Sequence, residues 1–218
     1  FRDAGGLWDK YPVEQVATPE GYARNPELVI NFYNERRKQL LDVVPNAGHL
    51  GVADLERDFN VTVVTQNVDN LHERAGSTHV IHLHGELTKV CSSRDPYNPH
   101  FVKELAPEEY EVKLGDKAGD GTQLRPFIVW FGESVPEIET AIRYVEQADI
   151  FVIIGTSLNV YPAAGLLNYV PRAAEVYLID PKPVDTHVMR PIHVIQKGAS
   201  EGVKELKALL AATQPPLL

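Results

Sequence analysis

The sequence predicts an α/β protein built on a doubly wound parallel sheet, and three observations lead to this prediction. Short runs rich in β-branched residues recur along the chain, at residues 61–65, 80–84, 127–130, 150–154, 176–179 and 193–195. Their apolar character is nearly continuous, as in parallel strands covered by helices on both faces. Helical stretches separate them, which is the alternation of an α/β fold. We therefore expect a Rossmann-like sheet with a smaller inserted lobe.

Two helices begin at readable caps. Asn25 is followed by Pro26 at the first helical position, and the apolar pattern then continues until Pro45. Asn46 caps the next helix, which runs to about residue 57 and leads into the strand at 61–65. Further helices are expected over residues 136–147, after Pro162 and over residues 201–212.

Two stretches interrupt the α/β alternation. Residues 3–18 form a Gly-bearing loop, and residues 92–125 are polar with several Gly and Pro. We expect both to be insertions that build the smaller lobe. The predicted domains are a Rossmann-like domain of residues 1–4, 44–86 and 126–214, and a small lobe of residues 5–43 and 87–125.

Composition excludes several classes of protein. A formal charge of -9 over 218 residues disfavours nucleic acid and anionic membrane as partners. One Cys forms neither an internal disulfide nor a multi-thiolate zinc site, which favours a reducing, cytoplasmic location. No apolar run approaches the roughly 20 residues that span a bilayer. The chain opens on Phe1 without a Met, so we expect residues upstream of it.

Polar residues follow two of the predicted strands. Gln66, Asn67 and Asp69 come after the first, and His84 with Gly85 ends the second. Open α/β sheets bind ligands at this carboxyl edge, so the set is a candidate reaction site. Alternatively, the first three residues form an Asx-type turn that caps the next helix.

Two more strand ends are candidates for a nucleotide. Gly155, Thr156 and Ser157 can offer N–H groups and hydroxyls to phosphate oxygens, although such a turn often only reverses the chain. Asp180 follows the strand at 176–179, where dinucleotide folds place an acid that accepts from ribose hydroxyls. A carboxylate at this position also repels a 2′-phosphate, which predicts NAD rather than NADP.

Taken together, these segments resemble the sirtuin (Sir2) family of NAD-dependent protein-lysine deacylases. The matching motifs, in family order, are Phe1-Arg2, Thr65-Gln66-Asn67-Val68-Asp69, His84-Gly85, Val129-Trp130-Phe131-Gly132-Glu133 and Gly155-Thr156-Ser157. The likeness covers almost the whole chain. It implies a transferase-type reaction in which NAD and an acylated lysine of a protein yield nicotinamide, acyl-ADP-ribose and free lysine.

The resemblance also implies residue roles. His84 is the general base, and its near-neutral pKa suits it to accept a proton. Asn67 and Asp69 line the nicotinamide pocket, and Gln66 lies on the ribose side. Phe1 shields the reactive sugar carbon, and Arg2 belongs to the closing loop. The remaining implied cofactor contacts are Gly155, Thr156, Ser157, Asp180 and Ala199.

The implied substrate site has two parts. Val129, Trp130, Phe131, Gly132 and Glu133 pair with the extended peptide by strand addition. Tyr33 and Arg36 lie three residues apart on one helix, and they resemble the Tyr-x-x-Arg signature of the desuccinylase branch, with Ala17 as its small neighbour.

A guanidinium and a phenol can together hold a distal carboxylate, which predicts a preference for succinyl or malonyl groups over acetyl. Arg37 projects about 100° further round the helix and is not expected to take part. Alternatively, Arg36 is a solvated residue that pairs with Glu35 or Glu14, and Tyr33 belongs to the core.

The chain departs from the family in three places. The Gly-Ala-Gly part of the cofactor loop would precede Phe1, and Asp180 stands where the family usually carries Asn. Most sirtuins bind a structural zinc through four cysteines after the HG motif, whereas this region offers only Cys91. Asp95 and His100 would complete only an irregular ligand set, so we predict no zinc.

Two other functions remain open: an NAD or ADP-ribose binding module without catalysis, and a protein ADP-ribosyltransferase. A monomer is expected.

Overall fold

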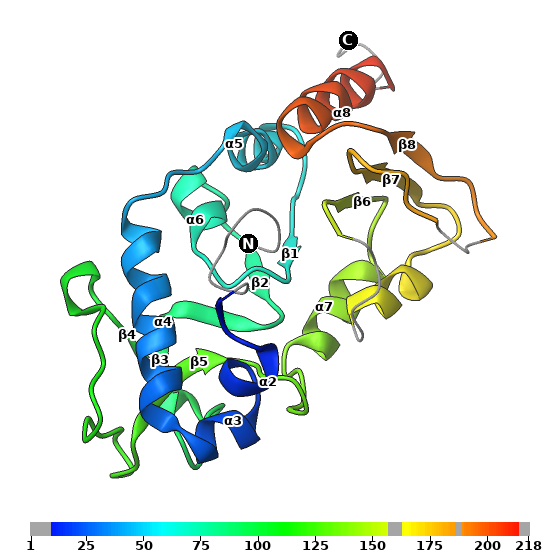
Figure 1. Cartoon of the computed structure of the whole chain (residues 1–218). Helices are drawn as coiled ribbons and strands as arrows, with labels where there is room; N and C mark the ends of the chain where they lie inside the picture. The colour runs from blue at the N-terminus through cyan, green and yellow to red at the C-terminus, as the bar shows by residue number, and fades with distance from the viewer. Residues whose placement is uncertain (1–9, 157–162, 186–188, 214–218) are drawn as a thin grey trace. The chain divides into compact units, whose positions relative to one another are not determined.

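The computed structural model describes residues 10–156, 163–185 and 189–213. By its internal contacts the chain divides into two compact units (Figure 1). Unit 1 comprises Phe1–Val43, Thr65–Asn70 and His82–Pro136, and unit 2 comprises Val44–Val64, Leu71–Ile81 and Glu137–Leu218. The division into a Rossmann-like domain and a small lobe stays a prediction.

Unit 1 combines short and long helices with an antiparallel sheet. Its helical elements are α2 (Val13–Val16), α3 (Pro19–Arg24), α4 (Pro26–Leu41), η2 (Pro99–Phe101) and η3 (Pro107–Glu109). Its strands are β3 (Gly85–Ser92), β4 (Lys103–Glu104) and β5 (Leu124–Ile128).

The N-terminal helices of unit 1 follow from their caps. Asn25 Oδ1 accepts the N–H of Leu28 at 3.2 Å, which confirms the predicted start of α4. The helix ends at Leu41 rather than at Pro45. Thr18 caps α3 in the same way, since its hydroxyl accepts the N–H of Gly21 at 2.9 Å. The predicted loop at residues 3–18 contains a helix, α2, near its end.

The sheet of unit 1 corrects the prediction for residues 127–130. This strand spans Leu124–Ile128 and is antiparallel to β3, with Cys91 opposite Arg125. The strand order is β4-β3-β5. The stretch after His84 was not among the predicted strands. Its alternation of polar and apolar residues is typical of a half-buried strand, but its partner lies far along the chain. Part of the expected polar insertion is therefore sheet.

Unit 2 contains the remaining elements. They are α5 (Ala47–Asp54), η1 (Leu55–Arg57), α6 (Leu71–Ala75), α7 (Ile138–Val145), β6 (Ile150–Ile154), η4 (Ala163–Tyr169), β7 (Glu175–Ile179), β8 (His193–Ile195) and α8 (Ala199–Thr213). Two short strands, β1 (Val63–Thr65) and β2 (Val80–His82), occur where the chain passes from one unit to the other.

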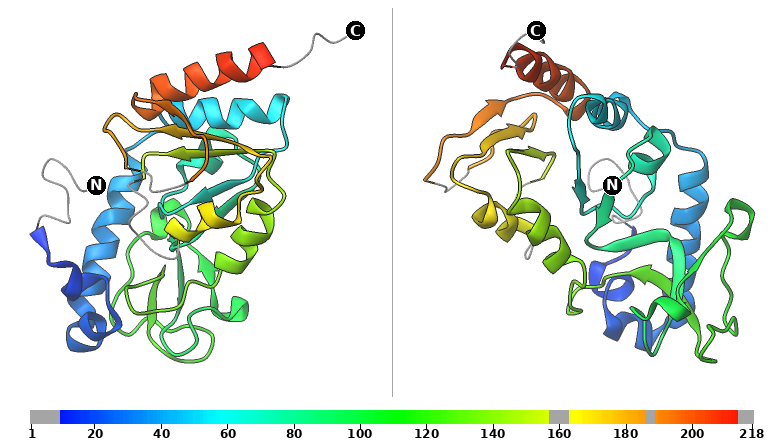
Figure 2. Two further views of the ribbon diagram at one scale, coloured as in Figure 1. Left: turned by 90° about the vertical axis from the view of Figure 1, so that its right-hand side faces the viewer. Right: turned by 180° about the vertical axis from the view of Figure 1, so that it is seen from behind.

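The strands β6, β7 and β8 form a parallel sheet in that order, and Figure 2 shows them side by side from two further directions. Their positions confirm the predicted strands at 150–154, 176–179 and 193–195. Helices α5 and α8 pack against each other, and the absence of a side chain at Gly202 lets α8 approach Ile179. The chain thus has a mixed α/β fold with parallel strands, as expected of a Rossmann-like protein.

Apolar side chains of these elements form the core of unit 2, with Val52, Tyr177, Ile179, Val203 and Leu206 among its buried members. Within the described residues, no helix has the length and apolar character needed to cross a membrane.

Candidate active site

The segment Thr65–Asn70 belongs to unit 1 and is fixed at both ends of its turn. The Thr65 hydroxyl accepts the N–H of Asn67 at 3.0 Å and so stabilises the turn that follows β1. The carbonyl of Val68 accepts the N–H of Leu87 at 2.7 Å. The backbone of β3 therefore holds the loop that carries Gln66, Asn67 and Asp69.

His84 is held by the same loop. Its Nδ1 lies 3.2 Å from the carbonyl oxygen of Gln66. Because a carbonyl only accepts, Nδ1 carries the proton and Nε2 keeps its lone pair. Burial lowers the pKa of His84, and the hydrogen bond to Gln66 only partly opposes this effect. The ring is therefore neutral near pH 7 and can accept a proton at Nε2.

Gly85 is required by the close approach of β5. Its φ is +87°, and a Cβ at this position would lie 2.1 Å from the carbonyl oxygen of Phe127. The backbone of β5 thus fills the space where a side chain would project. The glycine lets β3 and β5 approach each other directly after His84.

The segment after β5 connects the candidate base to the candidate peptide site. The N–H of Val129 donates to the carbonyl of His84 at 2.9 Å, and the N–H of Phe131 donates to the carbonyl of Ala17 at 3.0 Å. The Phe131 side chain is 54% exposed and accessible to a partner. His84, Ala17 and the Val129 to Glu133 segment are therefore neighbours within unit 1.

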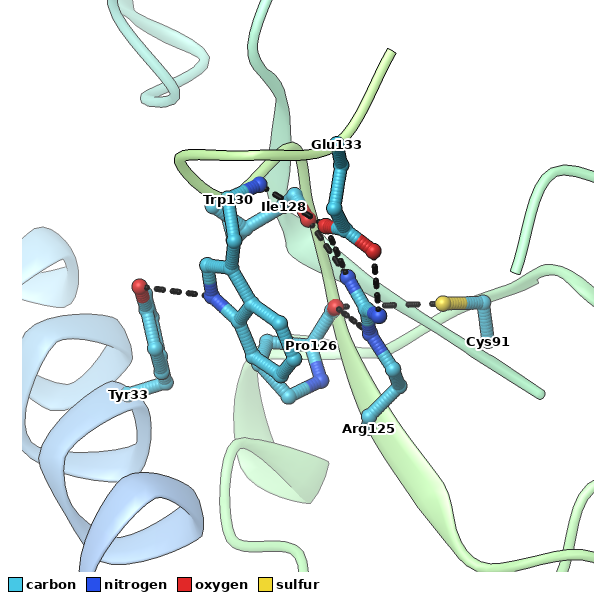
Figure 3. Close-up of polar contacts among 7 residues, drawn as sticks. All are labelled: Tyr33, Cys91, Arg125, Pro126, Ile128, Trp130 and Glu133. Atoms are coloured by element: carbon cyan, nitrogen blue, oxygen red, sulfur yellow. Dashed lines mark hydrogen bonds and ion pairs between the residues drawn. The ribbon is translucent and has the colours of Figure 1, made fainter. Parts of the chain in front are cut away.

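A buried ion pair organises this segment (Figure 3). The Arg125 guanidinium donates two hydrogen bonds of 2.9 Å to the Glu133 carboxylate, one to each oxygen. It also donates to the Ile128 carbonyl at 2.8 Å and lies 3.7 Å from the centroid of the Trp130 ring. The backbone N–H of Trp130 donates to Glu133 Oε1 at 2.8 Å. Burial lowers the pKa of Arg125, but the hydrogen bonds and charge of Glu133 more than offset this and raise it.

Sequence reasoning did not single out Arg125. It lies in a stretch interpreted as a polar insertion, although apolar residues follow it directly. The signal that could have identified it is a charged residue inside an apolar run, with an opposite charge at Glu133. Buried arginines are paired in almost all cases.

Tyr33 and Arg36 both lie on the buried face of α4. Their side chains are 0% and 7% exposed, so the alternative of a solvated Arg36 is wrong. The Arg36 guanidinium carbon lies 5.8 Å from the Tyr33 ring centroid. Burial lowers the pKa of Arg36, and the negative charge of Asp69 is among the effects that oppose this. Arg36 therefore lies within electrostatic reach of the Thr65–Asn70 segment.

The Tyr33 hydroxyl accepts a hydrogen bond of 3.1 Å from Trp130 Nε1, as Figure 3 shows. Burial raises the pKa of Tyr33 to about 12, so the phenol keeps its proton. Arg37, by contrast, holds the backbone of another loop, since its Nε donates to the Tyr110 carbonyl at 2.8 Å. Arg37 therefore holds backbone segments, although it too lies within electrostatic reach of Tyr33.

The candidate nucleotide contacts of unit 2 meet at one sheet edge. Ile154 and Ile179 are paired in the parallel register of β6 and β7, so Gly155 and Asp180 follow neighbouring strand ends. The φ of Gly155 is +62°, a left-handed value that glycine adopts readily. Asp180 Oδ1 accepts the N–H of Lys182 at 2.8 Å and leaves Oδ2 for a further donor. A carboxylate acceptor at this edge fits the hydroxyl donors of a nucleotide ribose.

The other implied cofactor contacts are less completely described. Thr156 follows Gly155 directly, and Ala199 is the first residue of α8. Phe1, Arg2 and Ser157 lie outside the described residues.

Cys91 is buried at the end of β3, and burial raises the pKa of its thiol to about 12. No group of three or more His, Cys, Asp or Glu side chains that could hold a metal occurs in the described part of the chain. Beside Cys91, Ser92 Oγ donates to Asp120 Oδ2 at 2.5 Å. The absence of structural zinc stays a prediction.

Comparison with known proteins identifies the family. The Sir2 family sequence model matches residues 1–162. An NAD-dependent protein deacylase of Bacteroides thetaiotaomicron is 84% identical over 96% of this chain and 90% of its own length. One from Helicobacter pylori is 47% identical over 94% of this chain and 87% of its own length.

Among solved structures, a Sir2 homologue in complex with NAD superposes with a TM-score of 0.81 at 38% identity, covering 98% of this chain and 84% of that one. Motif order, fold and overall similarity agree, and the chain belongs to the Sir2 family.

Proposed function

We propose that this protein is an NAD-dependent protein-lysine deacylase that removes acetyl groups and, preferentially, succinyl or malonyl groups. NAD, the acyl-lysine and one water molecule react, and the products are nicotinamide, acyl-ADP-ribose and free lysine. The observation that carries the proposal is the connection of His84 to the Val129 to Glu133 segment beside two buried acyl-site candidates, Tyr33 and Arg36. The 84% identical relative is itself named a deacylase, which supports the assignment.

The residues of this chain would divide the chemistry as follows. Bound NAD supplies the ribose carbon to which the acyl oxygen bonds as nicotinamide leaves. His84 accepts the proton of a ribose hydroxyl at Nε2, while the Gln66 carbonyl holds the opposite side of its ring. Asn67 and Asp69 orient the carboxamide of nicotinamide, and Gln66 lies on the ribose side. Gly155, Thr156, Ser157, Asp180 and Ala199 bind the rest of the nucleotide, with Phe1 and Arg2 closing over the sugar.

The peptide and the acyl group would be read by different residues. An extended peptide adds a strand along Val129 to Glu133, where main-chain groups give affinity without much sequence preference. The Arg36 guanidinium is a bidentate donor to a carboxylate, and the Tyr33 phenol is a third donor. Ala17, whose small side chain is buried, would leave room beside them. An acetyl group has no acceptor at its distal end to meet these donors.

A single reaction tests the activity. The protein is incubated with NAD and an acylated peptide, and nicotinamide and peptide mass are followed together. Nicotinamide release with loss of the acyl mass is expected. A mass gain on protein would instead indicate ADP-ribosyl transfer, and NAD binding without release would indicate an inactive module. His84→Ala is expected to lower kcat at least about 100-fold, whereas His100→Ala, an exposed histidine of η2, leaves it unchanged.

Acyl preference is tested with succinyl and acetyl versions of one peptide. A charge-assisted hydrogen bond contributes roughly 1.5 to 3 kcal/mol, which corresponds to about a tenfold to hundredfold preference. Arg36→Met is expected to remove most of the preference for succinyl in kcat/KM. An unchanged ratio would show that Arg36 does not bind the acyl group. Comparable turnover of NAD and NADP would likewise contradict the role of Asp180.

The proposal includes a cytoplasmic monomer that acts on acylated lysines of proteins and binds neither nucleic acid nor membrane. Light scattering after size-exclusion chromatography measures the oligomeric state directly.

A further inference from the structure

The Tyr33 hydroxyl is constrained by the chemistry of its neighbour. An indole N–H donates and never accepts, so in the 3.1 Å contact with Trp130 the phenol oxygen must be the acceptor. The O–H of Tyr33 therefore needs an acceptor other than Trp130. No other hydrogen bond of this hydroxyl occurs within the described residues, although the side chain is 0% exposed. A buried hydroxyl proton without an acceptor is costly, which favours a ligand that supplies one.

The indole is itself held on three sides. Arg125 lies 3.7 Å from the ring centroid, the backbone N–H of Trp130 is bound to Glu133, and Tyr22 contacts the ring with a centroid separation of 5.3 Å. Trp130 is 2% exposed. A side chain packed in this way has one available orientation, so the direction of its N–H is fixed before any substrate binds.

We propose that Trp130 is a positioning residue for acyl selectivity, acting through Tyr33. The indole N–H of Trp130 donates to the Tyr33 oxygen, so the Tyr33 hydroxyl can bind a substrate only as a donor. This donor lies beside the Arg36 cation. Two donors then face the same end of the acyl chain, and only an acyl group that ends in an acceptor satisfies both. The inference rests on the proposed deacylase function and goes beyond it, because Trp130 would select the acyl group in addition to contacting the peptide backbone.

The proposal predicts a specific failure when the indole N–H is removed. Without it, the phenol oxygen can rotate and accept from Arg36, which turns both groups away from the substrate. Trp130→Phe keeps an aromatic ring for Arg125 to cover but has no N–H. We expect kcat/KM for the succinyl peptide to fall about 3- to 10-fold, mainly through KM, and kcat/KM for the acetyl peptide to stay within about twofold.

A double-mutant cycle separates this role from simple packing. In a Tyr33→Phe background the hydroxyl is absent, so Trp130→Phe should have no further effect on the succinyl-to-acetyl ratio. A packing defect would lower kcat/KM for both peptides, with or without the Tyr33 hydroxyl. Calorimetric binding of the succinyl peptide to the protein without NAD gives a second readout, and its Kd should rise by the same factor. Tyr110→Phe removes a hydroxyl at the end of η3, elsewhere in unit 1, and is the matched control, for which kcat/KM of both peptides should stay unchanged.

If the phenylalanine variant does not fold, benzothienylalanine at position 130 keeps the bicyclic shape and replaces the N–H by sulfur. If the wild type prefers the succinyl peptide and the variant without the indole N–H keeps this preference, the inference is wrong and the proposed function is unaffected. The inference is also overturned if kcat/KM falls equally for both peptides, or if the effects of the two substitutions on the succinyl-to-acetyl ratio add in the double variant. A wild-type protein that releases no nicotinamide overturns both.

Discussion

The Arg125–Glu133 pair is expected to be a major source of stability in unit 1, and Glu133→Gln tests this. The two side chains are 5% and 14% exposed and joined by two hydrogen bonds of 2.9 Å. Replacing the carboxylate leaves a buried guanidinium without its counter-charge. Breaking a buried pair in this way costs about 3 to 5 kcal/mol. The glutamine retains one oxygen acceptor, so we expect about 3 kcal/mol, the lower end of that range.

For a chain of this size each kcal/mol lowers Tm by about 2 to 4 °C, so Glu133→Gln should lower it by roughly 6 to 12 °C. Glu133→Ala, which also removes the acceptor of the Trp130 N–H, should lower it further. Differential scanning calorimetry measures the shift, and near-UV circular dichroism reports the surroundings of Trp130.

The control is the same substitution in an exposed pair. Lys197 and Glu205 are 2.7 Å apart, with side chains 53% and 40% exposed, and water screens their attraction. Glu205→Gln should leave Tm unchanged. If Glu133→Gln melts within about 2 °C of wild type, or no lower than the control, the buried pair does not hold this segment and the reasoning is wrong.

Four further outcomes are expected. Because burial lowers the pKa of His84, kcat/KM should rise with pH through a pKa below the ordinary value of 6.5 and be level by neutral pH, as a pH-rate profile would show. Gly85→Ala should destabilise the protein by at least about 3 kcal/mol in urea unfolding, whereas Gly115→Ala, also at positive φ but with nothing near its Cβ, should cost only about 1 kcal/mol. The pKa of Asp120 is held at about 2, below its usual 3.8, so its contribution to stability is present above pH 3.8 and lost as pH falls towards 2; Asp120→Asn should flatten the dependence of Tm on pH in that window. Elemental analysis should find no tightly held zinc, and a chelator should leave Tm unchanged.

Local signals predicted the parts of the fold that depend on neighbouring residues. Asn25 and Asn46 cap α4 and α5 through hydrogen bonds to residues three positions ahead, so a short stretch of sequence contains the whole interaction. The apolar runs of β6, β7 and β8 are similarly self-contained, because strands of a covered parallel sheet are apolar on both faces.

The antiparallel sheet of unit 1 could not be predicted in the same way. The strand β3 alternates in character, and its stability comes from Leu124–Ile128, more than thirty residues along the chain. Pro126 and Arg125 made this partner resemble a loop. The steric need for glycine at position 85 could not be predicted for the same reason, since the backbone that approaches it belongs to β5.

The candidate site shows a similar limit. Motif order identified the site residues by type, and the helical spacing of Tyr33 and Arg36 predicted that they share one face. The orientation of the phenol could not be predicted, because it depends on Trp130, which depends on Arg125 and Glu133 in turn. A chain of contacts between residues distant in sequence leaves no local pattern.

A set of hydrogen bonds centred on one carboxylate holds the end of β3, next to the lone thiol of Cys91. The Ser92 hydroxyl donates to Asp120, and Asp120 Oδ1 accepts both the N–H and the hydroxyl of Thr122, at 3.1 and 2.7 Å. The oxygen of Ser92 accepts in turn the backbone N–H groups of Arg94 and Asp95, each at 3.0 Å. One carboxylate thus closes the turn before β5 and joins it to the end of β3, as a bound metal would do. Such a junction depends on the charge of Asp120 rather than on thiolate chemistry, and the thiol of Cys91 beside it stays protonated. We therefore expect this junction to withstand the chelators and oxidants that disrupt a zinc site, and to lose stability at low pH, where Asp120 becomes protonated.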